Sequence, residues 1–239
     1  MKRVLACLLV LVVALPAAAK SPYVTAQSLD LLPYVPPPPA ADSARAKAEM
    51  DEVLALQASR SPERTAQAAA DAVENVYVLF QPLLGPGFNA AALPKTDLLF
   101  TRVRDSEGAT LDPVKDVYKR PRPFQANTAV KPAIPLSMSG SYPSGHATAG
   151  TLMGIVMAEL LPEKRVAIWA RIDDYAESRI IGGVHYRSDL EAGKRAGAAI
   201  AAYMWANPSF RADFAAASNE LRASLGLPKL EVAKKVEDK

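Results

Sequence analysis

The chain has 239 residues, of which 28 are lysine or arginine and 25 are aspartate or glutamate, for a formal net charge of +3. Nucleic-acid-binding domains usually carry a strong basic excess, so this near balance argues against a nucleic-acid polymer as partner. Cysteine occurs once, at Cys7, which excludes an intrachain disulfide, and the fold must therefore be stabilised by packing.

Residues 1–19 have the pattern of a secretory signal peptide. A basic start, residues 1–3, precedes an apolar run over residues 4–15 and a group of small residues that suits cleavage. The run is shorter than the roughly 20 apolar residues of a membrane-spanning helix, and no later run reaches that length. We expect an exported chain that is not stably inserted in a membrane, and a periplasmic location if the source is Gram-negative.

Residues 20–41 are expected to form a proline-rich N-terminal arm, with four consecutive prolines at 36–39. Proline fixes φ and removes a backbone donor, which favours an extended, polyproline-like segment on the surface. Two interpretations are open, a spacer or a strap across a neighbouring subunit.

Residues 42–226 have helical patterning, and we expect a single all-α domain there. A first helix is predicted to begin at Asp42 or Ser43 and to run to about residue 57. Ser61-Pro62-Glu63 is a helix-start signal, and the helix that follows is expected to end within residues 82–87.

The remaining elements are also helical, since no strand rhythm of the kind found in β-sandwiches or barrels occurs. Glu107-Gly108 is expected to be a turn, residues 124–142 to be irregular, and residues 227–239 to be a charged flexible tail. Further helices are predicted over 95–106, 145–161, 163–180, 186–206 and 209–225.

The chain has only two histidines, and the first lies in Pro143-Ser144-Gly145-His146, ahead of a run of small residues. Ser144 can cap a helix there, which would leave the backbone N–H groups of Gly145 and His146 at its positive end. Such a terminus binds phosphate through unpaired donors and the helix dipole. Taken alone, the motif also fits a capped helix with an incidental histidine.

The second histidine, His185, precedes Asp189 by four residues, which places both side chains on one helix face. Asp189 can accept the Nδ1 proton and leave a lone pair on Nε2, as in histidines that act as nucleophile or general base. A surface ion pair would have the same spacing.

Three cations flank these histidines in the sequence, namely Lys115, Arg122 and Arg179. Together they would neutralise a phosphate dianion, a form of stabilisation that is often the largest contribution to catalysis. Lys119 and Arg120 lie between Lys115 and Arg122, so this stretch alone does not show which of its cations belong to the site. The combination indicates phosphoryl transfer without a metal.

In chain order these residues resemble the signature of the type 2 phosphatidic acid phosphatase superfamily: Lys-x6-Arg-Pro, Pro-Ser-Gly-His and Ser-Arg-x5-His-x3-Asp. Only Lys115 with Arg122 fits the first spacing. Roughly residues 30–225 resemble the class A bacterial nonspecific acid phosphatases within that superfamily. Ala147 stands where these phosphatases usually carry threonine, which could alter a hydrogen bond near the site.

The resemblance implies a single-domain helical bundle of the phosphatase and haloperoxidase kind, acting on small phosphomonoesters of broad specificity with no metal or other cofactor. His185 would form a phosphohistidine, oriented by Asp189, and His146 would protonate the leaving alcohol and then activate water. The resemblance also favours a homo-oligomer, a dimer or higher. The phosphate oxygens would be held by Lys115, Arg122, Ser144, Gly145 and Arg179.

Three alternatives are weighed against this interpretation. Vanadium haloperoxidases carry the same residue set, because vanadate mimics phosphate. Lipid-phosphate phosphatases are relatives that usually have several transmembrane helices. A periplasmic binding protein would hold phosphate without turnover.

Overall fold

The structure, a computed structural model, describes residues 21–230. The predicted signal peptide and most of the predicted charged tail lie outside these residues. Within them every regular element is a helix, which confirms the all-α prediction. No helix of the described residues is long and apolar enough to cross a membrane.

The helices follow one another along the chain with two short 3-10 helices, marked η, among them. They are η1 (Leu32–Tyr34), α1 (Ala44–Ser59), α2 (Pro62–Ala70), α3 (Val76–Leu84), α4 (Pro94–Tyr118), α5 (Pro123–Ala126), α6 (Gly145–Leu160), η2 (Pro162–Lys164), α7 (Arg165–Ile181), α8 (Arg187–Met204) and α9 (Pro208–Ser224).

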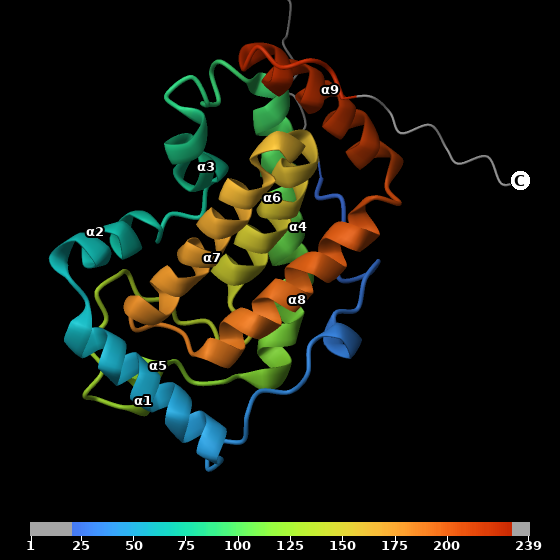
Figure 1. The fold of residues 1–239 in the computed structure, drawn as a ribbon. Coiled ribbons are helices and arrows are strands. Elements are labelled where there is room, and N and C mark those ends of the chain that lie inside the picture. Colours follow the sequence, from blue (N-terminus) through green and yellow to red (C-terminus); the bar gives the residue numbers. More distant parts are fainter. Residues whose placement is uncertain (1–20, 231–239) are drawn as a thin grey trace, which may run out of the picture.

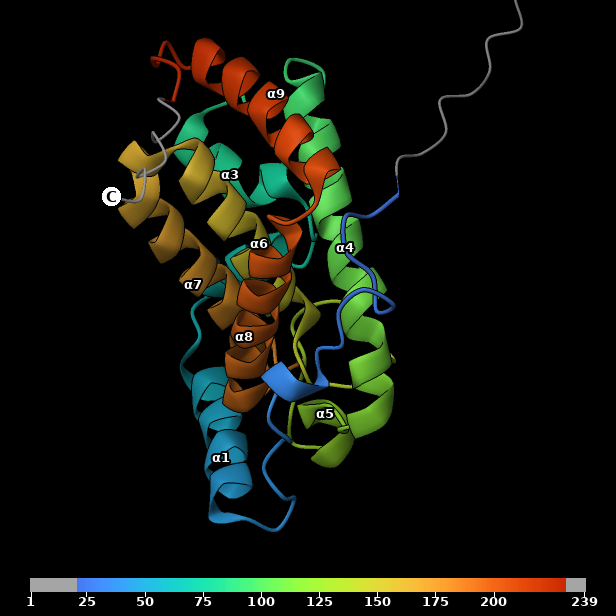
Figure 2. The ribbon, with the colours of Figure 1, turned by 90° about the vertical axis from the view of Figure 1, so that its right-hand side faces the viewer.

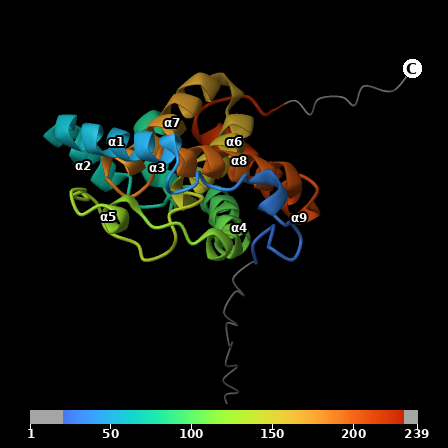
Figure 3. The same cartoon turned by 90° about the horizontal axis from the view of Figure 1, so that it is seen from below.

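Helix α6 lies at the centre, with α4, α7 and α8 packed around it (Figures 1 and 2). Twelve of its 16 residues are buried. A helix that is apolar or small on all sides is buried on all sides. Seen from below, α1 and α2 lie at one side of the bundle and α9 at the other (Figure 3).

Two glycines of α8 let its backbone lie directly on that of α6. A Cβ atom at Gly193 would lie 2.6 Å from the carbonyl oxygen of Ser144, and one at Gly197 would lie 2.6 Å from that of Thr148. The Ala147 methyl group is packed into the same contact and is buried. Ala147 therefore faces α8 and serves helix packing.

The expected single helix after Ser61 is two helices, α2 and α3, joined by residues 71–75. Asp71 is buried and accepts a 2.6 Å hydrogen bond from the Ser178 hydroxyl, as well as an ion pair with Arg171. The Asn75 side chain caps α3 by accepting from the N–H of Tyr77. These contacts with α7 divide an apolar pattern that is continuous in the sequence.

The expected turn at Glu107-Gly108 was wrong, because α4 continues through it to Tyr118. Helix propensity is a weak preference that packing overrides, and α4 packs along α6 and α9. Pro113, within the same helix, cannot donate to the carbonyl group of Ala109. That carbonyl instead accepts a 3.0 Å hydrogen bond from the N–H of Ala26, in the N-terminal arm.

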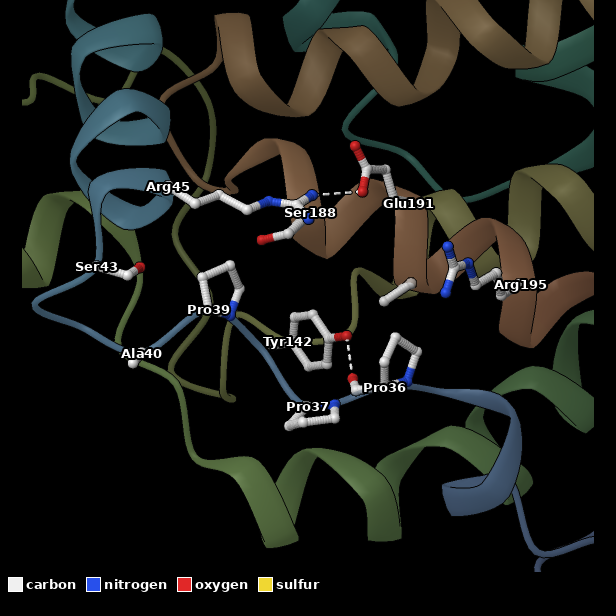
Figure 4. A pocket seen from close by; sticks show the side chains of 11 residues that line it. Pro36, Pro37, Pro39, Ala40, Ser43, Arg45, Tyr142, Ser188, Glu191 and Arg195 are labelled. Atoms are coloured by element: carbon white, nitrogen blue, oxygen red, sulfur yellow. Dashed lines mark hydrogen bonds and ion pairs between the residues drawn. The ribbon is translucent and has the colours of Figure 1, made fainter.

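The proline-rich arm packs against its own chain. Val24, Leu31 and Val35 are buried, and the Tyr142 hydroxyl donates to the carbonyl group of Pro36. The arm, α1 and α8 line a surface cavity of about 340 Å³ (Figure 4). None of the residues assigned to the phosphate site lines this cavity.

We predict that Gly193→Ala lowers the free energy of unfolding by about 1–3 kcal/mol, the usual cost of overpacking. The added methyl group would meet the Ser144 carbonyl oxygen, which can move only with the backbone of α6. Urea denaturation would measure the loss.

Gly108→Ala is the matched control, since Gly108 is also inside a helix but its nearest neighbour would be 4.0 Å away. There we expect unchanged or slightly greater stability, by up to about 1 kcal/mol. Equal stability of Gly193→Ala and the wild type would contradict the close contact of α6 with α8.

Candidate active site

The predicted site residues come from segments that meet at one end of α6, α7 and α8. Lys115 lies in α4 and Arg122 follows it. Arg179 is in the last turn of α7, and His146 is in the first turn of α6. The charges of Arg179, His185 and Lys115 all act on His146, so the two histidines and the cations form one cluster.

Asp189, at the start of α8, fixes the orientation of His185. The Nδ1 atom of His185 lies 3.1 Å from Oδ2 of Asp189, as the spacing of four residues predicts. The same carboxylate accepts from the N–H of Tyr186 at 2.8 Å, from the Ser141 hydroxyl, and from Arg120 at 2.6 Å. Three of these contacts meet at Oδ2, and Arg120 lies at Oδ1. Burial raises the pKa of Asp189, whereas Arg120, Ser141 and Tyr186 act in the opposite direction and favour a carboxylate that accepts the Nδ1 proton of His185.

Arg120 was not among the predicted site residues, yet it holds the site together. Its guanidinium bridges Asp189 and the buried Glu49, 2.9 Å away in α1. The Ser188 hydroxyl also contacts both Arg120 and Glu49. The sequence shows a cluster of cations after Lys115, but it does not show that Arg120 is the one that pairs with Asp189 and Glu49.

Arg122 contacts the other nitrogen of His185. Its Nη1 atom lies 3.1 Å from Nε2 of His185 and also donates to the carbonyl oxygen of Val184 at 3.1 Å. Nε of Arg122 donates to the carbonyl oxygen of Ser139 at 3.0 Å. The guanidinium is thus buried and fixed beside the free lone pair of His185.

The pKa of His185 is held well below its ordinary value, by burial first and then by the charges of Arg122, Lys115 and Arg179. A histidine with a lowered pKa keeps an unprotonated nitrogen at mildly acidic pH. His185 therefore has the protonation state that a nucleophile needs.

His146 is held by a different set of partners. Its Nε2 atom lies 3.0 Å from the carbonyl oxygen of Ala72 and must donate to it. Its Nδ1 atom lies 3.4 Å from Oε2 of Glu74, and its ring stacks on Tyr175 with 5.6 Å between centroids. Burial and the charge of Arg179 lower the pKa of His146 to about 3.

Arg179 is 5% exposed, and its Nε and Nη1 atoms have no hydrogen-bond partner. Within residues 21–230, the Tyr175 hydroxyl is the only other buried side-chain polar atom without one. Burial lowers the pKa of Arg179 to about 10. Buried donors are normally satisfied, so this guanidinium is ready for acceptor oxygens from a ligand.

The start of α6 has the geometry that the sequence predicts. The Ser144 hydroxyl caps the helix by accepting from the N–H of Ala147 at 3.3 Å. The N–H groups of Gly145 and His146 precede the first hydrogen bond of the helix, which runs from Thr148 to Ser144. Lys115 lies beside them, and its Nζ atom donates to the carbonyl oxygen of Gly140 at 3.3 Å.

Two carboxyl groups of the site were missed in the sequence. Glu74 contacts His146, and Glu107 is buried on α4 with Oε1 3.1 Å from where a Cβ atom of Gly145 would lie. Glu107 and Lys115 are eight residues apart, a spacing that shares a helix face. Because a turn was expected at Glu107-Gly108, Glu107 and Lys115 were not placed on one helix. No local pattern points to Glu74.

No group of three or more histidine, cysteine, aspartate or glutamate side chains that could hold a metal ion is found within residues 21–230. The arrangement instead offers cationic side chains and helix N–H groups around two histidines. It can hold a tetrahedral oxyanion against Nε2 of His185.

Comparisons with known proteins agree with this geometry. The family profile of the PAP2 superfamily matches residues 106–213. The chain is 32% identical over 197 residues to the non-specific acid phosphatase of Salmonella typhimurium, across 79% of this chain and 78% of that protein.

Two solved structures are similar in fold. One is a transmembrane PAP2 type phosphatidylglycerolphosphate phosphatase from Bacillus subtilis, with a TM-score of 0.52 and 18% identity over 70% of this chain and 87% of that one. The other is a bacterial vanadium-dependent iodoperoxidase, with a TM-score of 0.50 and 19% identity over 72% of this chain and 52% of that one.

The structural likenesses concern the fold alone, whereas the sequence identity extends over most of both chains. With the profile match and the three-part signature, it shows that this chain belongs to the PAP2 superfamily.

Proposed function

We propose that this protein is an exported acid phosphatase that hydrolyses small phosphate monoesters through a phosphohistidine at His185. The observation that carries this proposal is the state of His185. Its Nδ1 proton is held by Asp189, its Nε2 lone pair faces Arg122, and Arg179 has donors without acceptors nearby. The name of the Salmonella typhimurium relative, a non-specific acid phosphatase, supports phosphatase activity.

In the first step, Nε2 of His185 attacks phosphorus and forms a P–N bond as the P–O bond to the leaving group breaks. The leaving oxygen takes a proton from His146. Arg122 transfers its hydrogen bond from Nε2 to a phosphoryl oxygen, and Arg179 and Lys115 share the charge on the other oxygens. Stabilisation of this kind requires the groups to be in place before the reaction.

In the second step, His146 takes a proton from water and the resulting hydroxide attacks phosphorus. The P–N bond breaks, inorganic phosphate leaves, and His185 regains its lone pair. His146 thereby recovers the proton that it gave to the leaving group. The bonds and protons of the two steps balance without a metal or any co-reactant besides water.

Because its pKa is lowered, His146 needs a further cause to be protonated when the leaving group departs. In the free site, burial and Arg179 keep this histidine neutral at mildly acidic pH. A bound phosphate dianion places negative charge next to it and raises its pKa. We propose that the substrate itself recruits the proton that the leaving group later needs.

Export rests on the signal-peptide pattern of residues 1–19, and a periplasmic location follows if the source is Gram-negative. We further propose the division expected from the sequence: a signal at 1–19, an arm at 20–41, a catalytic domain at 42–226 and a tail at 227–239. A homo-oligomer rests on the family resemblance.

Hydrolysis of p-nitrophenyl phosphate at mildly acidic pH in EDTA tests the proposed function. We expect turnover by the wild type and a loss of at least about 10³-fold in His185→Ala, because no other group can form the intermediate. Circular dichroism would confirm that the variant folds. Equal turnover of the two proteins would place the nucleophile elsewhere, and loss of wild-type turnover in EDTA would indicate a metal.

His146→Ala tests the general acid through its dependence on the leaving group. We expect kcat/KM to fall by about 10²–10⁴-fold for an alkyl phosphate, the usual contribution of general acid catalysis. The fall should be much smaller for p-nitrophenyl phosphate, whose leaving group departs without a proton. Equal losses for the two substrates would show that His146 does not protonate the leaving oxygen.

A further inference from the structure

Two carboxyl groups lie inside a site that otherwise suits an anion. Oε2 of Glu74 is 3.4 Å from Nδ1 of His146. Oε1 of Glu107 would lie 3.1 Å from a Cβ atom at Gly145, a point that is 4.0 Å from Nζ of Lys115. Each carboxyl group therefore lies against a group assigned to the phosphate or to the leaving group.

The cations of the site keep donors without acceptors although these carboxyl groups are near. Among the described residues, Glu107 has no ion pair within 4.0 Å, and Nε and Nη1 of Arg179 have no acceptor. Glu107 is 8% exposed, so water does little to screen its charge. A phosphate dianion brought to Arg179 and Lys115 would be repelled by two nearby carboxylates, and their protonation removes that repulsion.

From this placement, and resting on the proposed function, we propose that Glu74 and Glu107 form an acidic gate. As carboxylates they exclude a doubly charged oxyanion from the site. After taking up protons from solvent they admit it, and a protonated carboxyl group can also donate a hydrogen bond to an oxyanion oxygen.

The electrostatic surroundings are consistent with this proposal. Burial raises the pKa of Glu107 well above its ordinary value, and the charge of Glu74 raises it further, while Lys115 lowers it. Burial likewise raises the pKa of Glu74, with Arg104, Arg179 and Lys115 acting in the opposite direction. The other titratable groups that face the pair are Asp112 on α4, His146 on α6 and Tyr175 on α7.

The histidines do not offer an equivalent switch in the free site. The pKa of His146 is lowered to about 3, and that of His185 is lowered well below its ordinary value. Burial raises the pKa of Asp189, but its ion pair with Arg120 and its hydrogen bonds from Ser141 and Tyr186 act in the opposite direction. Before an anion binds, proton uptake by the site at mildly acidic pH therefore falls to Glu74 and Glu107.

Sulfate is a suitable probe, because it remains a dianion throughout the pH range of interest and is not hydrolysed. Binding to the full-length protein would be measured by calorimetry from pH 5 to pH 7. For the wild type we expect the dissociation constant to rise at least about tenfold, as linkage to the release of one proton requires. For the Glu74→Gln/Glu107→Gln double variant we expect a smaller rise than in the wild type, because only the proton that a bound dianion brings to His146 remains linked to binding.

Asp116→Asn is the matched control. It removes an exposed carboxyl group of the same helix, whereas the charge of Asp112 acts on both Glu74 and Glu107. We expect it to keep the pH dependence of the wild type. The single variants Glu74→Gln and Glu107→Gln should each flatten the dependence in part, and they serve if the double variant fails to fold, as judged by circular dichroism.

The acidic gate would be overturned if folded Gln variants kept the full pH dependence, if Asp116→Asn lost it, or if the wild type bound sulfate equally at pH 5 and pH 7. These results are independent of turnover. A wild type that binds sulfate more tightly in acid but does not hydrolyse p-nitrophenyl phosphate would refute the proposed function and leave the gate standing. Turnover that needs His185, with an unchanged pH dependence in the Gln variants, would refute the gate alone.

Discussion

The buried carboxylate of Asp189 is the interaction on which the rest of the site depends. It links His185 to the start of α8, to Ser141 in the loop before α6 and to Arg120 after α4. Its backbone carbonyl group also accepts from the N–H of Ser144, at the start of α6. Removing one partner from such a network leaves buried charge uncompensated, so the orientation of His185 and the stability of this end of the bundle cannot be separated.

A second constraint sets the distance between the two histidines. His185 precedes α8 and His146 begins α6, and these two helices touch through backbone atoms at Gly193 and Gly197. The contact leaves little freedom for side-chain rearrangement. Arg179 is buried without partners for two of its nitrogen atoms, an arrangement that costs stability in the free protein and that a bound oxyanion would offset in the proposed mechanism.

The all-α fold and the meeting of the signature residues could be predicted because they follow from spacing. Nδ1 of His185 contacts Asp189 as four-residue spacing requires, and Ser144 caps α6 as its hydroxyl suggests. The exceptions have tertiary causes. Gly108 lies inside α4 because packing outweighs propensity, and Asp71 ends α2 because α7 supplies its partners. Glu74 contacts His146, which is 72 residues away in the sequence, and a contact at that separation cannot be read from a local pattern.

The side chains that hold the two histidines form separate sets. His185 depends on α8 and on the segments around Arg120 and Ser141, whereas His146 depends on the connection between α2 and α3 and on Tyr175. In the proposed mechanism, a change in residues 71–75 would alter proton delivery while leaving the nucleophile intact. The two halves of the chemistry are therefore separately tunable, and the range of alcohols released can diverge among such proteins without disturbing how phosphorus is attacked.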